Sequence, residues 1–181
     1  MTAKEFTQKL FRLTPSIEDF LNLGYKHEIA EQLMLEYKCI AKESKLDEIN
    51  IADELLLLVQ NYDCSKVQIG IVSFFKEIYI LDDYIVLGEV EGDILALRKE
   101  TLEIHVLDNE NPQWIIWTCA SSGKHFLDAM ICAAEFFSIR IKNTHVAKNR
   151  EYTSENVNKC ASKAGGDAYQ NFYSVLLGLD E

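Results

Sequence analysis

The chain has 181 residues, of which 48% are hydrophobic and 10% aromatic, so it has enough apolar surface to fold and low-complexity disorder is excluded. At this length a chain buries roughly 70% of the surface that its unfolded form exposes, which predicts one globular domain over residues 1–181. Its 29 acidic and 18 basic side chains give a net charge of -11. Such a surface repels phosphate backbones and anionic lipid headgroups, so we expect neither nucleic acid nor a membrane as a partner.

The sequence carries no pattern of export or membrane insertion. Its beginning lacks the apolar stretch and the small-residue cleavage site of a secretory signal. The longest apolar run, 55–59, is far shorter than the ~20 residues that a membrane helix needs. Five cysteines without CxxC spacing are predicted to be reduced, mostly buried thiols of a cytoplasmic protein: Cys39, Cys64, Cys119, Cys132 and Cys160.

Residues 1–63 form a predicted helical N-terminal part. A proline followed by serine and two acidic residues is typical of a helix start and predicts a helix over 16–24. Apolar positions spaced three, four and seven apart predict a second, amphipathic helix over 26–41. Good helix formers after an acidic start predict a third helix over 47–60.

The pattern changes in residues 64–141 to short runs rich in Ile, Val, Tyr, Phe and Trp that turn signals separate. The predicted strands are KVQIGIVSFF, EIYIL, YIVLGEV, DILALR, LEIHVLD and QWIIWTC. The loops between them are too short for the crossover that a parallel pair of strands requires. The sequence therefore predicts an antiparallel meander sheet, on which a long helix over 124–142 should pack.

Residues 142–181 form a predicted helical C-terminal extension. A polar link precedes a helical section that begins at Ser154 and breaks at a Gly-Gly pair. Asp167 is the predicted N-cap of a final amphipathic helix with aromatic residues on one side. The last 41 residues carry five basic and five acidic side chains, so the excess acid lies in the first 140. The predicted fold class is therefore α+β, with helices before and after a central antiparallel sheet.

The sequence offers little catalytic chemistry. Neither glycine-rich phosphate motif occurs, and Gly88 and Gly92 are interpreted as turn residues with acidic neighbours. Cys119 and His125, with Asp128 as a third group, form the one pairing that resembles an activated thiol. The four histidines are isolated in the sequence, and none has metal-binding spacing. We therefore predict a nonenzymatic protein without a metal or a cofactor.

Carboxylates and tryptophans remain as candidate contact residues. Acidic side chains are densest around 82–83 and 89–93, although Asp also suits the turns expected there. Trp114 and Trp117 are three positions apart, so in a strand they face opposite sides and one of them is expected to be exposed. An acidic surface with an exposed tryptophan favours a basic protein as partner.

Five elements between residues 66 and 140 follow one another in a recognisable order. They are a strand ending in glycine, a Gly-Asp turn, a strand ending in leucine, a strand ending in aspartate and a helix start: Ile85–Gly88, Gly92-Asp93, Ile94–Leu97, Ile104–Asp108 and Lys124–Leu127. In this order they resemble the SUKH superfamily of small α+β proteins. An early LPxxY element and an Asn-Gly turn that are common in that family have no counterpart in residues 1–60.

The resemblance implies a noncatalytic bacterial immunity protein that binds a cognate toxin and covers its active site. Such toxins are often nucleases or deaminases with basic substrate channels, which an acidic surface attracts. The predicted contact residues are the acidic turn residues and the tryptophans: Asp82, Asp83, Glu89, Glu91, Asp93, Trp114 and Trp117. Two other functions stay open. One is an enzyme or small-ligand binder with a pocket between sheet and helices, and the other is an assembly subunit that docks through its C-terminal aromatic helix.

Overall fold

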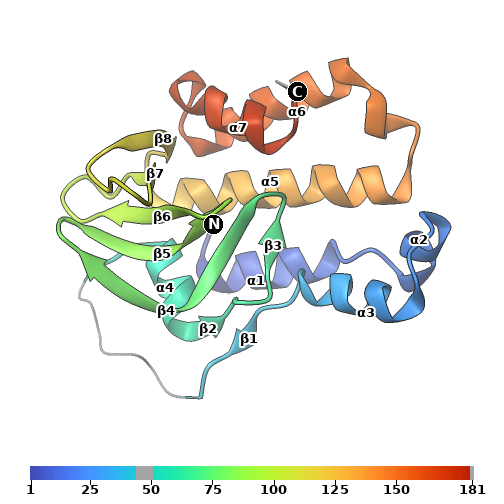
Figure 1. Cartoon of the computed structure of the whole chain (residues 1–181), viewed down its shortest axis with the longest axis horizontal. Coiled ribbons are helices and arrows are strands. Elements are labelled where there is room, and N and C mark those ends of the chain that lie inside the picture. The colour runs from blue at the N-terminus through green and yellow to red at the C-terminus, as the bar shows by residue number, and fades with distance from the viewer. Residues whose placement is uncertain (44–50, 180–181) are drawn as a thin grey trace.

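The computed structural model describes residues 1–43 and 51–179, and it confirms the predicted α+β fold class. Helix α5 (Gly123–Lys142) runs through the middle of the molecule (Figure 1). Helices α6 (Arg150–Ala164) and α7 (Gln170–Leu176) lie on one side of α5, and the first three helices lie on the other. The sheet lies towards the N-terminal end of α5.

The described N-terminal residues form helices α1 (Ala3–Arg12), α2 (Ile17–Asn22), α3 (His27–Leu35) and α4 (Glu54–Asn61). Helix α2 confirms the prediction for 16–24. Helix α1 was not predicted, although a capping box marks its start. The Thr2 side chain accepts a hydrogen bond from the Glu5 backbone N–H, and the Glu5 carboxylate accepts one from the Thr2 backbone N–H.

The helix expected over 26–41 ends at Leu35, so its predicted C-terminal third is wrong. Its last two residues instead form strand β1 (Ile40–Ala41), which pairs antiparallel with β2 (Tyr62–Asp63). Strand partners 21 and 23 residues away in sequence satisfy backbone groups that a helix would have satisfied locally. The helical spacing of the apolar residues does not reveal this pairing.

Helix α4 begins later than the prediction for 47–60. The predicted start lies outside the described residues, and positions 51–53 are not helical. Asp53 is the N-cap, because its Oδ1 accepts hydrogen bonds from the backbone N–H groups of Leu55 and Leu56 at 2.9 and 3.2 Å. This N-cap fixes the start of the helix at Glu54.

The predicted antiparallel meander is confirmed, with neighbouring strands in sequence order. The strands are β3 (Gln68–Ile69), β4 (Val72–Leu81), β5 (Tyr84–Val90), β6 (Asp93–Arg98), β7 (Ile104–Leu107) and β8 (Ile115–Ala120). The first two strands differ from the prediction. The chain turns at Gly70, inside the first predicted strand, and then continues as the single strand β4 through Lys76. The pairing of β4 with β5 shifts register between Phe74 and Tyr79.

The interpretation of Gly88 as a turn residue is wrong. It lies inside β5 opposite Phe74, next to the register shifts of both neighbouring strand pairs. A Cβ atom at Gly88 would overlap the carbonyl oxygen of Ser73 and lie 3.0 Å from the Phe74 Cα. Gly88 is therefore needed for a close approach of two backbones. Gly92, with φ of 94°, is a turn residue as predicted.

The C-terminal extension is helical as expected, with two corrections. Helix α6 begins at Arg150 rather than Ser154, because the Asn149 side chain accepts a hydrogen bond from the Tyr152 N–H. Asp167 is not an N-cap. It begins a short 3-10 turn (Asp167–Tyr169) that leads directly into α7.

The main core draws on all parts of the chain, from Ala3 in α1 to Leu177 after α7. It lies between the sheet and the helices, and α5 contributes the largest buried face. A second, smaller buried cluster covers the other face of the sheet around Val86 and Leu107. Among the described residues, no helix combines the length and the hydropathy needed to cross a membrane.

Candidate protein-binding surface

The structure divides the predicted acidic residues between two ends of the sheet. Asp82 and Asp83 form the turn from β4 to β5, whereas Glu91 lies in the turn from β5 to β6. Because consecutive strands are antiparallel, these two turns lie at opposite ends of β5. The predicted contact residues therefore do not form one patch.

The turn at Asp82 and Asp83 is next to basic residues. The Lys99 backbone N–H donates a hydrogen bond to the Asp83 carbonyl at 2.9 Å, and the Lys99 ammonium donates one to the Asp82 carbonyl. Arg98 pairs with Tyr84 in the adjacent register position. Nearby positive charge weakens the negative potential of this end of the sheet.

The opposite end, which we name the acidic sheet end, has no such compensation within its own segments. Segments 88–93 and 107–117 contain no lysine, arginine or histidine. Their carboxylates are Glu89, Glu91, Asp93, Asp108 and Glu110. Strand pairing brings the two segments together, since Ile94 is opposite Leu107 in the register of β6 and β7. Asp108 and Glu110 were not among the predicted contact residues.

Two of these carboxylates hold the loop between β7 and β8. The Asp108 Oδ1 accepts hydrogen bonds from the backbone N–H groups of Glu110 and Asn111 at 2.8 and 2.7 Å. The Asp93 Oδ1 accepts one from the Asn109 N–H at 3.1 Å. Such turns order the loop and leave the Glu110 carboxylate exposed to solvent.

The two tryptophans differ in the way the sequence predicts. Trp114 is 66% exposed and follows the ordered loop, where its backbone N–H donates to the Asn111 carbonyl. Trp117 is partly buried and packs against the main core, opposite Val106. The structure therefore places Trp114, but not Trp117, beside the acidic sheet end as an exposed aromatic side chain.

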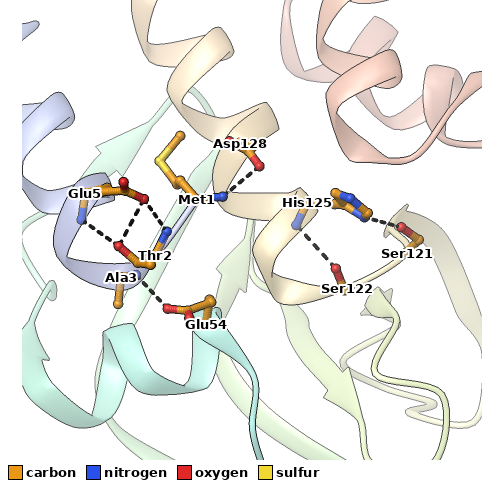
Figure 2. A network of polar contacts seen from close by, with 9 residues as sticks. All are labelled: Met1, Thr2, Ala3, Glu5, Glu54, Ser121, Ser122, His125 and Asp128. Carbon is orange, nitrogen blue, oxygen red and sulfur yellow. Dashed lines mark hydrogen bonds and ion pairs between the residues drawn. The ribbon is translucent and has the colours of Figure 1, made fainter.

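The pairing considered for thiol catalysis does not form. Cys119 is fully buried in β8, and burial raises the pKa of its thiol well above the usual value. The His125 Nδ1 instead shares a hydrogen bond of 2.7 Å with the Ser121 hydroxyl (Figure 2). Asp128 points away from His125 and accepts a hydrogen bond from the Met1 amino group at 2.7 Å. Neither His125 nor Asp128 therefore acts as the predicted partner of Cys119 in the described part of the chain.

His105 is a buried polar residue without a predicted role. It is 3% exposed, and neither ring nitrogen has a hydrogen-bond partner among the described residues. The Glu103 carboxylate lies 3.6 Å from Nε2, which is too long for a good hydrogen bond. Burial lowers the pKa of His105 and outweighs the opposing effect of Glu103. Residues 102–107 alternate between the two faces of the sheet, and this alternation is the sequence signal that puts His105 on the face opposite to Ile104 and Val106.

Two cavities bear on the ligand-binding alternative. A groove of about 740 Å³ lies between α1 and α3, with Phe11 and Leu35 in its lining. A cavity of about 290 Å³ lies between α3, β3 and α5, where Glu36 and Tyr37 are among the lining residues. Burial raises the pKa of Glu36 and raises that of Tyr37 to about 12. Within residues 1–43 and 51–179, no three His, Cys, Asp or Glu side chains come together as metal ligands.

Comparison with known proteins identifies no relative: no family model, no curated protein and no solved structure matches the chain. The resemblance to the SUKH superfamily stays a prediction from the sequence.

Proposed function

We propose that this chain is a noncatalytic immunity protein that binds a cognate bacterial toxin and neutralises it by covering its active site. The observation that supports the proposal best is the acidic sheet end with the exposed Trp114 beside it. The SUKH-like order of elements in the sequence points to the same function.

The physical argument combines two effects. Five carboxylates in segments without basic residues attract a basic surface and speed the encounter with it. A large exposed aromatic side chain then supplies the contact area that slows dissociation, because Trp is among the residues that most often anchor protein interfaces. The ordered loop keeps Trp114 in place before binding, which limits the entropy lost on association.

A growth experiment tests the function as a whole. The protein encoded by the neighbouring open reading frame is expressed in a bacterial host, with and without this chain. Toxicity that co-expression relieves is the expected result and identifies the partner. A harmless neighbour, or toxicity that persists during co-expression, contradicts the proposal.

A binding experiment with that partner tests the acidic sheet end. The double substitution Glu91→Lys and Glu110→Lys should slow association about tenfold or more at low salt, and added salt should reduce the difference. Both side chains are exposed, and neither makes a hydrogen bond that holds the loop. Glu91 has a φ of 53° in the wild type, so lysine adds no new backbone strain.

The matched control is the double substitution Asp83→Lys and Glu100→Lys at the other end of the sheet. It makes the same change in net charge with two exposed side chains. Association that slows equally in both double variants would show a general charge effect and remove the acidic sheet end from the interface. Trp114→Ala should mainly speed dissociation, because it removes contact area rather than charge.

A small-ligand binder is the second candidate function. The cavity between α3, β3 and α5 favours it, since it combines apolar walls with the carboxyl group of Glu36. Native mass spectrometry of the purified protein tests this candidate. A stoichiometric small molecule that is lost in Glu36→Ala would support it, and a ligand-free spectrum would count against it.

A further inference from the structure

Two cysteines extend the short ladder between β1 and β2. In this ladder Ile40 lies opposite Asp63 and Ala41 lies opposite Tyr62. One further step along the same register places Cys39 opposite Cys64. The two residues are 25 positions apart in the sequence and have no motif spacing. Their pairing therefore follows from the tertiary structure alone.

The hydrogen bonds of the ladder determine which kind of position this is. The Lys42 N–H donates to the Asn61 carbonyl at 2.9 Å, so Lys42 and Asn61 form a hydrogen-bonded pair. Pair types alternate along an antiparallel ladder, which makes Cys39 and Cys64 a non-hydrogen-bonded pair. At such pairs the Cα atoms are about 4.5 Å apart and the side chains are closest, which lies within the range that a disulfide spans.

The two thiols differ in their access to solvent. The neighbouring Cys39 side chain and burial together raise the pKa of the Cys64 thiol, so Cys64 stays protonated. Cys64 is fully buried, whereas Cys39 is partly exposed. A reagent from solution therefore reaches Cys39 first.

We propose that Cys39 and Cys64 form a reversible disulfide by exchange with a small disulfide such as oxidised glutathione. The Cys39 thiolate attacks one glutathione sulfur, which forms a mixed disulfide and releases one glutathione thiolate. The Cys64 sulfur then attacks the Cys39 sulfur, gives its proton to water and releases the second glutathione. The two protein thiols are oxidised and one glutathione disulfide is reduced to two thiols.

The link would stabilise a weak junction of the fold. The described β1–β2 ladder has only two residue pairs, and it joins the segment after α3 to the end of α4. A disulfide there closes a loop of the unfolded chain and so lowers the entropy of the unfolded state. The oxidised protein should therefore melt at a Tm roughly 5 to 10 °C above that of the reduced protein.

Peptide mapping of the native wild-type protein tests the proposal without any substitution. The protein is incubated with oxidised glutathione, its free thiols are alkylated, and the digest is analysed by mass spectrometry. The expected product is a Cys39–Cys64 peptide that is lighter than the two reduced peptides by about 2 Da, which dithiothreitol separates. Recovery of both cysteines as alkylated or singly glutathionylated peptides would overturn the proposal.

A second thiol pair in the same molecule provides the comparison. Cys160 on α6 lies next to Cys132 on α5, but both side chains are almost fully buried. Cys132→Ser should leave the increase in Tm on oxidation unchanged, whereas Cys39→Ser should abolish it. An increase that survives in Cys39→Ser and disappears in Cys132→Ser would assign the disulfide to the helix pair and refute the assignment made here.

Discussion

At Gly88 the missing side chain is the important feature. Any Cβ atom there would overlap the Ser73 carbonyl, which is backbone and cannot move aside as a flexible side chain can. We expect Gly88→Ala to lower the free energy of unfolding by about 3 kcal/mol, the upper part of the range for overpacking. Urea denaturation measures this loss.

The control for that substitution is Gly24→Ala. Gly24 has a φ of 89° and no atom within 4 Å of an added Cβ, so alanine adds backbone strain without a clash. Strain of this kind costs about 1–2 kcal/mol. Equal losses in the two variants would show that the close approach of β4 and β5 is not what requires Gly88.

His105 should make stability depend on pH. Its pKa is lowered in the folded protein because burial disfavours the charged ring, so the unfolded chain binds the proton more readily. The free energy of unfolding is therefore highest above the pKa of about 6.5 that histidine has in the unfolded chain. It falls as the pH drops below that value. Glu103 opposes this effect, and Arg98 adds to it.

The substitution His105→Phe tests this dependence. An apolar ring of similar shape needs no hydrogen-bond partner in this position, and it cannot titrate. Between pH 7.5 and pH 5.5 the free energy of unfolding should therefore fall less in His105→Phe than in the wild type. The same fall in both proteins would mean that His105 is not the responsible group.

Among the secondary structure elements, helices α4 and α5 share one side chain. Asp53 caps α4 with its Oδ1, and its Oδ2 accepts a hydrogen bond from the Gly123 N–H, at the start of α5, at 2.9 Å. The carboxylate is 5% exposed, and burial raises its pKa despite these three N–H donors. One residue thus sets the start of α4 and its position relative to α5.

The loss in the free energy of unfolding on replacement of Asp53 should increase with the number of hydrogen bonds removed. Asp53→Ala removes the cap and leaves the buried Gly123 N–H unpaired, so we expect a loss of about 2–4 kcal/mol. Asp53→Asn keeps one oxygen for the α4 cap and points an amide group at Gly123, so its loss should be smaller. Chemical denaturation of both variants provides the test, and equal losses would contradict the shared-cap explanation.

For the molecule as a whole, the C-terminal extension is part of the core. Phe172, Tyr173, Leu176 and Leu177 are at most 3% exposed, and the Tyr173 hydroxyl donates a hydrogen bond of 3.0 Å to the Cys119 carbonyl. The aromatic side of α7 thus faces the interior, which counts against the open alternative that the chain docks on another molecule through this helix.

A chain that ends at Gly166 should not fold. Loss of four buried apolar side chains removes roughly 6–12 kcal/mol, which is comparable to the whole stability of a typical domain. Near-ultraviolet circular dichroism should show the loss of tertiary packing. The control Val175→Ser, at an exposed position of α7, should keep the wild-type spectrum. A folded truncated protein would exclude α7 from the core.

Local sequence patterns predicted much of the fold. Alternation and short loops are enough for the meander, because each strand pairs with its neighbour in sequence and needs no distant partner. The helical spacing of apolar residues predicted α5, because the hydrogen bonds of a helix are also local in sequence. It failed at Ile40 and Ala41, where β2 supplies the backbone partners, and at the start of α4, where Asp53 decides the boundary.

Local sequence patterns predicted only part of the candidate site. Composition and turn signals predicted acidic turns and an exposed tryptophan as contact residues, since these features depend on residue type and local spacing. The direction of the strands decides which carboxylates lie together. It separates Asp83 from Glu91 and brings Glu110 to the acidic sheet end.

The amino-acid pattern alone was sufficient for the acidic α+β class and the order of its strands, because charge and periodicity are local properties. Tertiary packing decided that α7 is core, that Gly88 allows two backbones to approach closely, and that Cys39 lies opposite Cys64. Those features depend on contacts between residues far apart in the chain. Their strength comes from burial and close approach, which exist only once the chain has folded.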